Sequence, residues 1–451
     1  MTERPAPPSS EARIDRPAGP SSSRRGFLKG TAGAGAIAAA GPMIAPMVHA
    51  AGSDVIKVGL VGCGGRGSGA AEQALTADSG TRLVAMADVF SDRLTDALSA
   101  LKSSAVGAKV DVPKDRQFDG FEGFKHVIDQ VDLVLLTTPP HFRPMQLAYA
   151  VSKGVNTFVE KPMAVDGPGL RMFIEACKAA KAKNLSLVNG FCWRYDGPRR
   201  ETMKRVFDGQ IGKVTAIETT YNSQGVWDPR KTREQCGSDM EYQLRNWYYY
   251  SWLSGDHIVE QAVHGIDTMN WVMKDQLPVR CWGVGGRQVR TDPKYGNIWD
   301  HFSVVYEYPE GVRGYHHCRH WVNTPNQVKD YILGSKGTAD VFGNAITGEN
   351  KWRYRAGRER ASGNGGAHSD MYQVEHDEMF AAIRAGKPVN NGEQAATSTL
   401  LAIMGRDAAY TGQVLTPDQV LNSKTDLSPA RYEFGPNPVP PVPVPGVTKF
   451  A

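Results

Sequence analysis

The chain has 451 residues, of which 41% are hydrophobic and 22% are charged, and its formal net charge is +5 at pH 7. This length is enough for two domains, each with its own hydrophobic core. Residues 1–50 hold six Lys/Arg and three Asp/Glu, so the remainder carries only +2. That near balance argues against binding to nucleic acid or to a membrane surface.

Residues 1–50 have the layout of an export signal. Arg24-Arg25 precedes an apolar stretch rich in Ala and Gly that closes with a small-residue site at Ala50. This order is typical of a secretory leader, and paired arginines are typical of its twin-arginine form. The alternatives are a disordered basic tail or a membrane anchor, but glycines and prolines dilute the stretch below what a spanning helix needs. We predict cleavage after Ala50, export by the twin-arginine (Tat) machinery and a periplasmic location.

The next feature is an apolar run at 55–61 that passes into G-x-G-x-x-G at 62–67. This predicts a buried strand, a tight turn and a helix whose first N–H groups face a pyrophosphate. A second apolar run ends at Asp88, 21 residues after the last glycine, where a carboxylate can accept hydrogen bonds from the adenosine ribose. NAD is therefore predicted over NADP, with NADP as the alternative because Arg93 lies nearby. The cofactor-binding residues predicted here are Gly62, Gly64, Gly65, Arg66, Gly67 and Asp88.

The predicted export route and the predicted cofactor constrain each other. The twin-arginine route carries folded proteins, so a cofactor acquired in the cytoplasm can travel with the protein. Outside the cytoplasm there is no pool of nicotinamide nucleotide to exchange with. We therefore expect the dinucleotide to be held tightly and regenerated within one site.

Residues 51–193 alternate between helical and strand patterns, which predicts an α/β domain with a doubly wound parallel (Rossmann) sheet. Helices are predicted at 92–105, 144–153 and 167–182, and strands at 131–138, 156–160 and 185–190. Ligands of such sheets collect beyond the carboxyl ends of the strands. This rule places further cofactor-binding residues around one crevice, namely Thr138, Pro139, His141, Glu160, Lys161 and Arg194.

Residues 194–425 have a different texture and are predicted to form a second, α+β domain. Alternating aromatic and β-branched runs predict a largely antiparallel sheet, and three apolar stretches predict helices packed on it. The tail at 426–451 is rich in proline, which indicates an extended polyproline segment and a strap onto a neighbouring subunit. The strand runs are 214–221, 279–285, 301–308 and 313–318, and the helices are 258–273, 371–385 and 393–410.

The cysteines and histidines do not predict a metal site. The six cysteines contain no C-x-x-C pair, so Cys63, Cys177 and Cys192 are interpreted as small buried hydrophobes, with isolated pairing elsewhere left open. The group of His316, His317 and His320, together with His257, is the metal-binding alternative. Neighbouring residues of a strand point to opposite faces, so packed or solvated histidines are favoured.

Several of these motifs together resemble the glucose–fructose oxidoreductase/inositol dehydrogenase (Gfo/Idh/MocA) family. The resemblance covers nearly the whole chain after residue 50. It implies a Rossmann domain followed by an open-faced sheet domain that carries substrate contacts and oligomer interfaces, hence a homo-oligomer (dimer or tetramer). The motifs are G-x-G-x-x-G at 62–67, the turn at 138–141, Glu160-Lys161-Pro162, Gly190-Phe-Cys-Trp-Arg194 and Glu260-x-x-x-His264-x-x-Asp267.

Lys161, His264 and Glu260 are the predicted catalytic residues. Hydride transfer from a carbinol to a nicotinamide needs a base for the hydroxyl proton, and Lys161 at a strand end is placed to act so. A structural lysine that bonds a carbonyl is the alternative. Glu260 and His264, spaced i and i+4, are expected on one helix face, where His264 can relay the proton and Glu260 can orient a substrate hydroxyl. The family usually has Asp at the Glu260 position, and Asp267 is interpreted as structural.

An aromatic concentration at Trp227 and 247–252 precedes the predicted catalytic segment. Flat rings beside polar groups suit the C–H face of a sugar. The same composition is typical of a subunit interface, and the two interpretations are left equal.

Three functions follow from these features. The first is an exported oxidoreductase that transfers a hydride between bound NAD(P) and a sugar, polyol or sugar-derived substrate. The second is an NAD-dependent glycosidase that acts by transient oxidation and elimination, although the pair Glu260 and His264 is closer to the dehydrogenase branch. The third is a non-catalytic sugar-binding protein, which the intact Lys161 and His264 disfavour.

Overall fold

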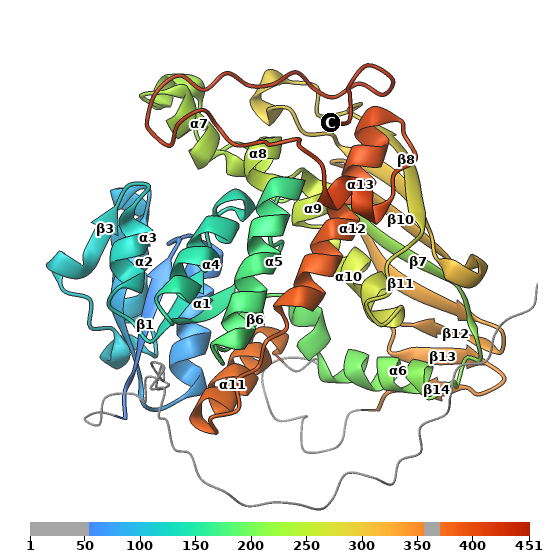
Figure 1. The fold of residues 1–451 in the computed structure, drawn as a ribbon, viewed down its shortest axis with the longest axis horizontal. Coiled ribbons are helices and arrows are strands. Elements are labelled where there is room, and N and C mark those ends of the chain that lie inside the picture. Colours follow the sequence, from blue (N-terminus) through green and yellow to red (C-terminus); the bar gives the residue numbers. More distant parts are fainter. Residues whose placement is uncertain (1–53, 356–369) are drawn as a thin grey trace, which may run out of the picture. The chain divides into compact units, whose positions relative to one another are not determined.

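The computed structural model describes residues 54–355 and 370–451, so the predicted export signal at 1–50 lies outside the described residues. The described chain contains a six-stranded and an eight-stranded sheet with helices packed on them (Figure 1). Within the described ranges, no helix combines the length and the apolar character that crossing a bilayer requires.

The first sheet is parallel throughout and has the strand order β3-β2-β1-β4-β5-β6, which confirms the predicted doubly wound fold. The order reverses between β1 and β4, which is the switch point where ligands bind in such sheets. Its strands are β1 Ile56–Val61, β2 Thr81–Asp88, β3 Gln117–Asp119, β4 Leu133–Leu136, β5 Asn156–Val159 and β6 Leu187–Asn189. Its helices are α1 Gly65–Ala77, α2 Ser91–Ser103, α3 Gly123–Ile128, α4 Arg143–Ser152 and α5 Gly167–Ala182.

The second sheet has the order β14-β13-β12-β11-β7-β10-β9-β8. Only the β7–β10 pair is parallel, so the predicted largely antiparallel sheet is confirmed. The four strands β11 to β14 were absent from the sequence prediction. The strands are β7 Val214–Ser223, β8 Arg280–Gly286, β9 His301–Glu307, β10 Arg313–His320, β11 Gln327–Gly334, β12 Gly337–Asp340, β13 Ala345–Gly348 and β14 Trp352–Arg353.

Buried and half-buried residues alternate strictly along β9 and β10, so the second sheet has one buried and one half-buried face. Two helices cover the buried face: α10 Val263–Val272 contacts β7, β10 and β11, and α12 Gly392–Thr411 contacts β8 and β9. The alternation also places His316 in the interior and His317 on the other face.

The chain returns to the first sheet after completing the second. Helix α11 (Met371–Arg384) packs on α1, and the amide of Leu187 in β6 donates to the carbonyl of Val389 at 2.8 Å. Helix α12 then contacts α5 as well as the second sheet, and one hydrophobic core extends through both parts. The predicted boundary at residue 194 thus separates the two sheets along the chain. It does not separate two packing units, because α11 and α12 follow it and still pack on the first part.

The helix predicted at 258–273 is broken, so that prediction is wrong. Helix α9 (His257–Glu260) ends before α10 begins at Val263. The amide of Ala262 donates to the carbonyl of His257, five residues back, which is a wider turn than an α-helix makes. Glu260 and His264 therefore lie on two short helices rather than one face of a continuous one.

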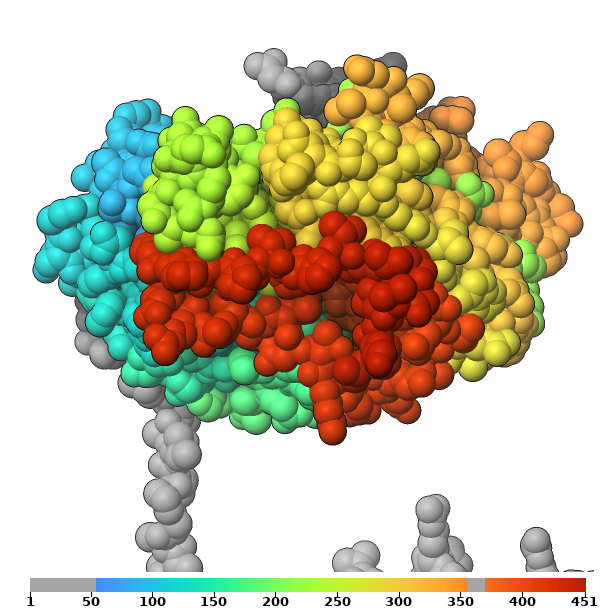
Figure 2. All heavy atoms as spheres, turned by 90° about the horizontal axis from the view of Figure 1, so that it is seen from above, coloured from blue at the N-terminus to red at the C-terminus, as the bar shows by residue number. Residues whose placement is uncertain are grey.

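The C-terminal segment 422–451 is extended and lies along its own chain. It passes helix α7 (Asp239–Arg245), where the amide of Met240 donates to the Gly435 carbonyl at 3.1 Å. Further on, Nε1 of Trp299 donates to the Pro443 carbonyl at 3.0 Å. Figure 2 shows this segment in red, running beside the yellow-green region that contains α7.

The six cysteines are all free and buried, as expected for Cys63, Cys177 and Cys192, and no disulfide pairs the others. Within residues 54–355 and 370–451, no cluster of three or more His, Cys, Asp or Glu side chains has the geometry to hold a metal ion.

Candidate active site

A cavity of about 460 Å³ lies at the carboxyl ends of β1, β2, β4 and β5. Residues of the first sheet form one side of it, and residues 221–264 of the second half form the other. Ten predicted site residues from the first half line this cavity, and so do Glu260 and His264. The ten are Gly62, Gly64, Gly65, Arg66, Gly67, Asp88, Thr138, Pro139, Glu160 and Lys161.

The glycines of the β1–α1 turn each meet a separate steric demand. Gly62 has φ +95°, and a Cβ there would lie 2.7 Å from the amide nitrogen of Thr138. A Cβ on Gly67 would lie 2.0 Å from the carbonyl oxygen of Gly62. Gly64 and Gly65, by contrast, have nothing within 4 Å and face open space in the cavity. The turn thus leaves room for a pyrophosphate to lie close to the protein backbone at the start of α1.

Asp88 is held at the end of β2 by two backbone amides. Its Oδ2 accepts from the amide of Cys63 at 2.7 Å, and its Oδ1 accepts from that of Phe90 at 2.9 Å. Burial raises the pKa of the Asp88 carboxyl despite these bonds. Each oxygen keeps a further lone pair, so the carboxyl can still accept from a ribose hydroxyl at this end of the cavity.

Glu160 lies beneath the middle of the cavity. It is 3% exposed, and its Oε1 forms an ion pair with Nε of Arg66 at 3.1 Å, without the alignment of a hydrogen bond. A Cβ on Gly190 would lie 2.6 Å from the Glu160 carboxylate, so only glycine leaves room for it. The sequence Glu160-Lys161-Pro162 therefore places a buried carboxylate beside the cofactor turn and a lysine in front of it.

Lys161 reaches across to the second half of the molecule. Its Nζ lies 3.1 Å from Oε1 of Glu260 and also donates to the Glu260 carbonyl. Both side chains are only 12–13% exposed. Strand β5 and helix α9 together thus hold an ammonium and a carboxylate at the catalytic end of the cavity.

His264 lies beside this pair in an aromatic environment. Its ring stacks on Trp193 at 4.8 Å and 23°, and meets Phe191 edge-on at 6.1 Å. Burial, reinforced by the charges of Lys161 and Arg199, holds the pKa of His264 well below its usual value. A neutral imidazole that lines the cavity can accept the proton of a substrate hydroxyl.

Arg143 is a site residue that the sequence analysis missed. Its guanidinium is buried and donates to the carbonyls of Thr138 and Pro162, the latter at 2.7 Å. Burial lowers its pKa to about 10. Arg143 ties together the turns that follow β4 and β5, and thereby fixes the residue next to Lys161. Other cavity-lining residues missed from sequence are Trp193, Tyr221, Gln261 and Tyr372.

Two predicted cofactor-binding residues do not line the cavity. The Nε2 of His141 contacts the Tyr432 hydroxyl of the C-terminal segment at 2.8 Å, and burial lowers the His141 pKa to about 4. Arg194 instead forms a two-pronged ion pair with Asp267, with its Nε 2.9 Å from Oδ2.

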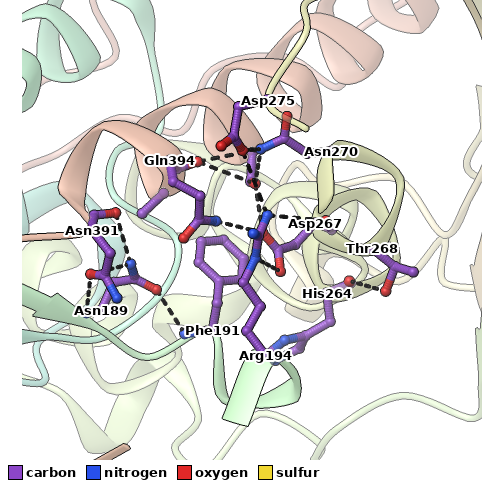
Figure 3. A network of polar contacts seen from close by, with 12 residues as sticks. Asn189, Phe191, Arg194, His264, Asp267, Thr268, Asn270, Asp275, Asn391 and Gln394 are labelled. Atoms are coloured by element: carbon purple, nitrogen blue, oxygen red, sulfur yellow. Dashed lines mark hydrogen bonds and ion pairs between the residues drawn. The ribbon is translucent and has the colours of Figure 1, made fainter. Parts of the chain in front are cut away.

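Asp267, predicted as structural, is the centre of a network that fixes α10 (Figure 3). Besides Arg194, its Oδ1 accepts from Nε2 of Gln394 at 2.8 Å and from the hydroxyl of Ser398 at 2.7 Å. The network joins α10, α12 and the turn that follows β6. It positions the helix that carries His264 without entering the cavity.

The aromatic concentration at 247–252 is largely core. Tyr248, Tyr249 and Tyr250 are each 1% exposed and belong to one buried cluster. Trp227, Trp247 and Tyr248 line the cavity, so part of the group faces a ligand. In the described chain these rings pack mainly against each other, an outcome that neither sequence interpretation included.

Comparisons with known proteins agree with this geometry. Residues 56–191 match the model of an oxidoreductase family with an NAD-binding Rossmann fold, and residues 200–340 match the GFO/IDH/MocA C-terminal domain. Inositol 2-dehydrogenase 3 of Saccharopolyspora erythraea is 25% identical over 299 residues, which cover 65% of this chain and 75% of that protein.

Two further similarities are to a glycosyl hydrolase and to the solved structure of an oxidoreductase. Glycosyl hydrolase family 109 protein 1 of Bacteroides fragilis is 27% identical over 179 residues, 39% of this chain and 36% of that protein. The crystal structure of an aldose-aldose oxidoreductase from Caulobacter crescentus, complexed with glycerol, superimposes with a TM-score of 0.61 at 18% identity. The superposition covers 80% of this chain and 99% of that one, and shows the shared fold.

A dinucleotide turn at the switch point of a parallel sheet, faced by a lysine, a carboxylate and a histidine, defines an NAD-binding oxidoreductase. The cavity residues fit NAD, because open space above Gly64 and Gly65 adjoins a carboxylate placed for the ribose. The chain belongs to the Gfo/Idh/MocA family.

Proposed function

We propose that this protein is an exported oxidoreductase that transfers a hydride between a tightly bound NAD(P) and a sugar, polyol or sugar-derived substrate. The observation that carries the proposal is the convergence of Lys161, Glu260 and His264 in the same cavity as the dinucleotide turn. The similarity to an inositol 2-dehydrogenase supports a polyhydroxylated substrate.

The catalytic end supplies an acid–base group and a means of orienting the substrate. His264, uncharged, accepts the hydroxyl proton of the carbinol, and the Lys161 ammonium stabilises the developing alkoxide. Glu260 holds the ammonium in place and offers a second oxygen to a neighbouring hydroxyl. When bound, the nicotinamide supplies the hydride acceptor.

The adenosine end is built to retain its ligand. Arg245 of α7 lies 3.9 Å from the Phe90 ring and pairs with Asp92 at 2.9 Å, so the second half of the molecule is fastened over the end of β2. Phe90, Phe121 and Phe142 form the wall of the cavity there. This enclosure supports a cofactor that stays bound and is reoxidised or re-reduced in place.

Releasing the nucleotide by denaturation tests the cofactor assignment. The purified protein should yield close to one NAD(H) per chain, since a 2′-phosphate would meet the Asp88 carboxylate. Asp88→Ala should shift the bound fraction toward NADP without unfolding the protein. Predominantly NADP in the wild-type protein would refute the assignment. Turnover is then sought with a panel of inositols, aldoses and aryl glycosides, followed at 340 nm and by phenol release.

Export is tested separately. Changing Arg24 and Arg25 to Lys should leave folded, cofactor-loaded precursor in the cytoplasm. Continued export of that variant would contradict the twin-arginine route while leaving the catalytic proposal untouched.

A second candidate is an NAD-dependent glycosidase, and the similarity to glycosyl hydrolase family 109 protein 1 favours keeping it. In that case oxidation at one carbon acidifies its neighbour, elimination expels the aglycone, and the hydride returns at the end. Phenol release from aryl glycosides without net reduction of NAD would establish it. Net interconversion of a carbinol and a carbonyl would establish the dehydrogenase.

A further inference from the structure

His264 rests on an indole ring from a different element. Trp193 lies in the turn Cys192–Tyr195 after β6, is 8% exposed, and lines the same cavity as His264. The two rings are nearly parallel, at 23° and 4.8 Å between centroids. Tyr221 of β7 is also parallel to Trp193, at 13° and 6.3 Å. The plane of the imidazole is thus set by an aromatic platform rather than by a hydrogen bond, because Nδ1 of His264 has no partner among the described residues.

A buried cation lies on the same platform. The guanidinium carbon of Arg199, on helix α6 (Gly197–Phe207), lies 4.3 Å from the Trp193 ring centroid and 4.2 Å from that of Phe342. Arg199 is 7% exposed, and its Nε forms an ion pair with Asp196 at 3.2 Å. Cation–π contacts of this kind gain strength where both partners are removed from water.

We propose that Trp193 and Arg199 are positioning residues for His264: the indole fixes the plane of the imidazole, and the guanidinium held on the indole opposes a positive charge on it. The inference rests on the proposed catalytic role of His264. It assigns functions to two further residues, Trp193 and Arg199, which the proposed mechanism does not use. Arg199 belongs to none of the motifs quoted from the sequence, and Trp193 lies in one of them, Gly190-Phe-Cys-Trp-Arg194, without a role assigned to it.

The electrostatic part of the inference follows from the groups around His264. Lys161 and Arg199 are the cations near it, and both lower the His264 pKa in addition to burial. The acidic and weakly acidic groups on the surrounding elements are Glu260, Asp267, Asp330, Asp196, Tyr221, Tyr372 and Cys192. Glu260 is paired with Lys161, Asp267 with Arg194 and Asp196 with Arg199, so Arg199 acts on the imidazole through its position on the indole against which His264 stacks.

The test is an NMR titration of the imidazole in the holoenzyme, with histidine labelled at Cε1 and His264→Gln used to assign its signal among the 11 histidines. Removing a cation raises the pKa of a neighbouring imidazole, so Arg199→Gln should move the His264 midpoint upward by roughly one pH unit. Arg199→Lys keeps the charge and should leave the midpoint within a few tenths of wild type. Arg200→Gln is the matched control, since Arg200 is the next residue of α6, is 40% exposed and pairs with Glu378.

The role of the indole is tested in parallel. Trp193→Leu should broaden or split the His264 signal because the ring plane is no longer fixed, and Trp193→Phe should restore one sharp signal. The proposal is overturned if Arg199→Gln leaves the midpoint unchanged, if Arg200→Gln moves it equally, or if Trp193→Leu gives a wild-type signal. These readouts do not need a substrate, so a failure to find turnover would refute the proposed function and leave this result standing.

Discussion

Lys161 and Glu260 meet across the cavity from opposite halves of the molecule, with Nζ 3.1 Å from Oε1 and a second bond from Nζ to the Glu260 carbonyl. The first sheet supplies the ammonium and helix α9 the carboxylate. The pair forms only when both halves are folded together, so catalytic geometry and interdomain packing depend on each other.

Lys161→Ala should keep the bound dinucleotide and lose about two to three orders of magnitude in turnover, the usual effect of removing a group that stabilises charge in the transition state. Glu260→Asp shortens the carboxylate by one methylene and should lengthen the ion pair, lowering turnover less than Lys161→Ala does. Kinetics and released nucleotide are measured on the same samples. Near wild-type turnover of Lys161→Ala on a true substrate would remove Lys161 from the mechanism.

Asp267→Asn should destabilise the fold while leaving the cofactor in place. The change leaves the Arg194 guanidinium, which is 16% exposed, with only the more distant Asp275 carboxylate at 3.8 Å, so the cost should lie below the roughly 3–5 kcal/mol of breaking a fully buried ion pair. Urea unfolding and nucleotide content give the two readouts. If nucleotide were lost with the unfolding free energy unchanged, Arg194 would contact the cofactor, as the sequence predicted.

Asp330 makes stability depend on pH in an unusual direction. Burial raises its pKa to about 7, and no aligned hydrogen bond reaches its carboxyl oxygens within the described residues. The folded state therefore keeps a proton that the unfolded chain releases near pH 3.8, so this contribution to stability is present below pH 3.8 and is lost as pH rises through 7.

Asp330→Asn removes this loss of folding stability at high pH, because an amide side chain does not ionise. The pKa of Asp330 differs by about three units between the folded and unfolded states, and each unit corresponds to about 1.4 kcal/mol. The free energy of unfolding of the variant, relative to that of the wild type, should therefore grow by about 4 kcal/mol between pH 4 and pH 8. Urea midpoints at both pH values measure this, with the exposed Asp115→Asn as control. An equal difference at pH 4 and pH 8 would show that Asp330 is ionised throughout.

Phe434→Ala should speed dissociation of the bound dinucleotide. Phe434 packs on Phe121 at 5.5 Å and on Phe90 at 6.0 Å, so it supports the cavity wall from outside. Exchange against labelled NAD measures the rate, and Val447→Ala, 73% exposed in the same segment, is the control. Equal exchange rates in both variants would mean that the tail does not limit release.

The parts of this fold that could be predicted from sequence are those with local signals. The glycine turn, Asp88 and the strands β1, β2, β4, β5 and β6 follow from backbone geometry and period, and all appear in the structure, whereas the three-residue strand β3 was not predicted. The break between α9 and α10 could not be foreseen, because both halves are apolar and only a wide turn at Ala262 separates them.

The site residues divide in the same way. Most predicted residues of the glycine turn and of Glu160-Lys161-Pro162 line the cavity, whereas Arg143 and Arg199 lie outside the motifs, and Trp193 lies in one without having been assigned a role. Arg143 gave one usable signal, a charged residue at the start of an otherwise apolar helix. His141 and Arg194 were placed by the rule of strand ends, and their partners Tyr432 and Asp267 lie 291 and 73 residues away.

The position of segment 422–451 at the end of the described chain sets an order of assembly. Both sheets and the glycine turn leave the ribosome before Tyr432 and Phe434 do. The phenylalanine wall of the dinucleotide site therefore stays unsupported until Phe434 has been synthesised. A cofactor that entered during this interval would be enclosed once Tyr432 and Phe434 pack on Phe90 and Phe121.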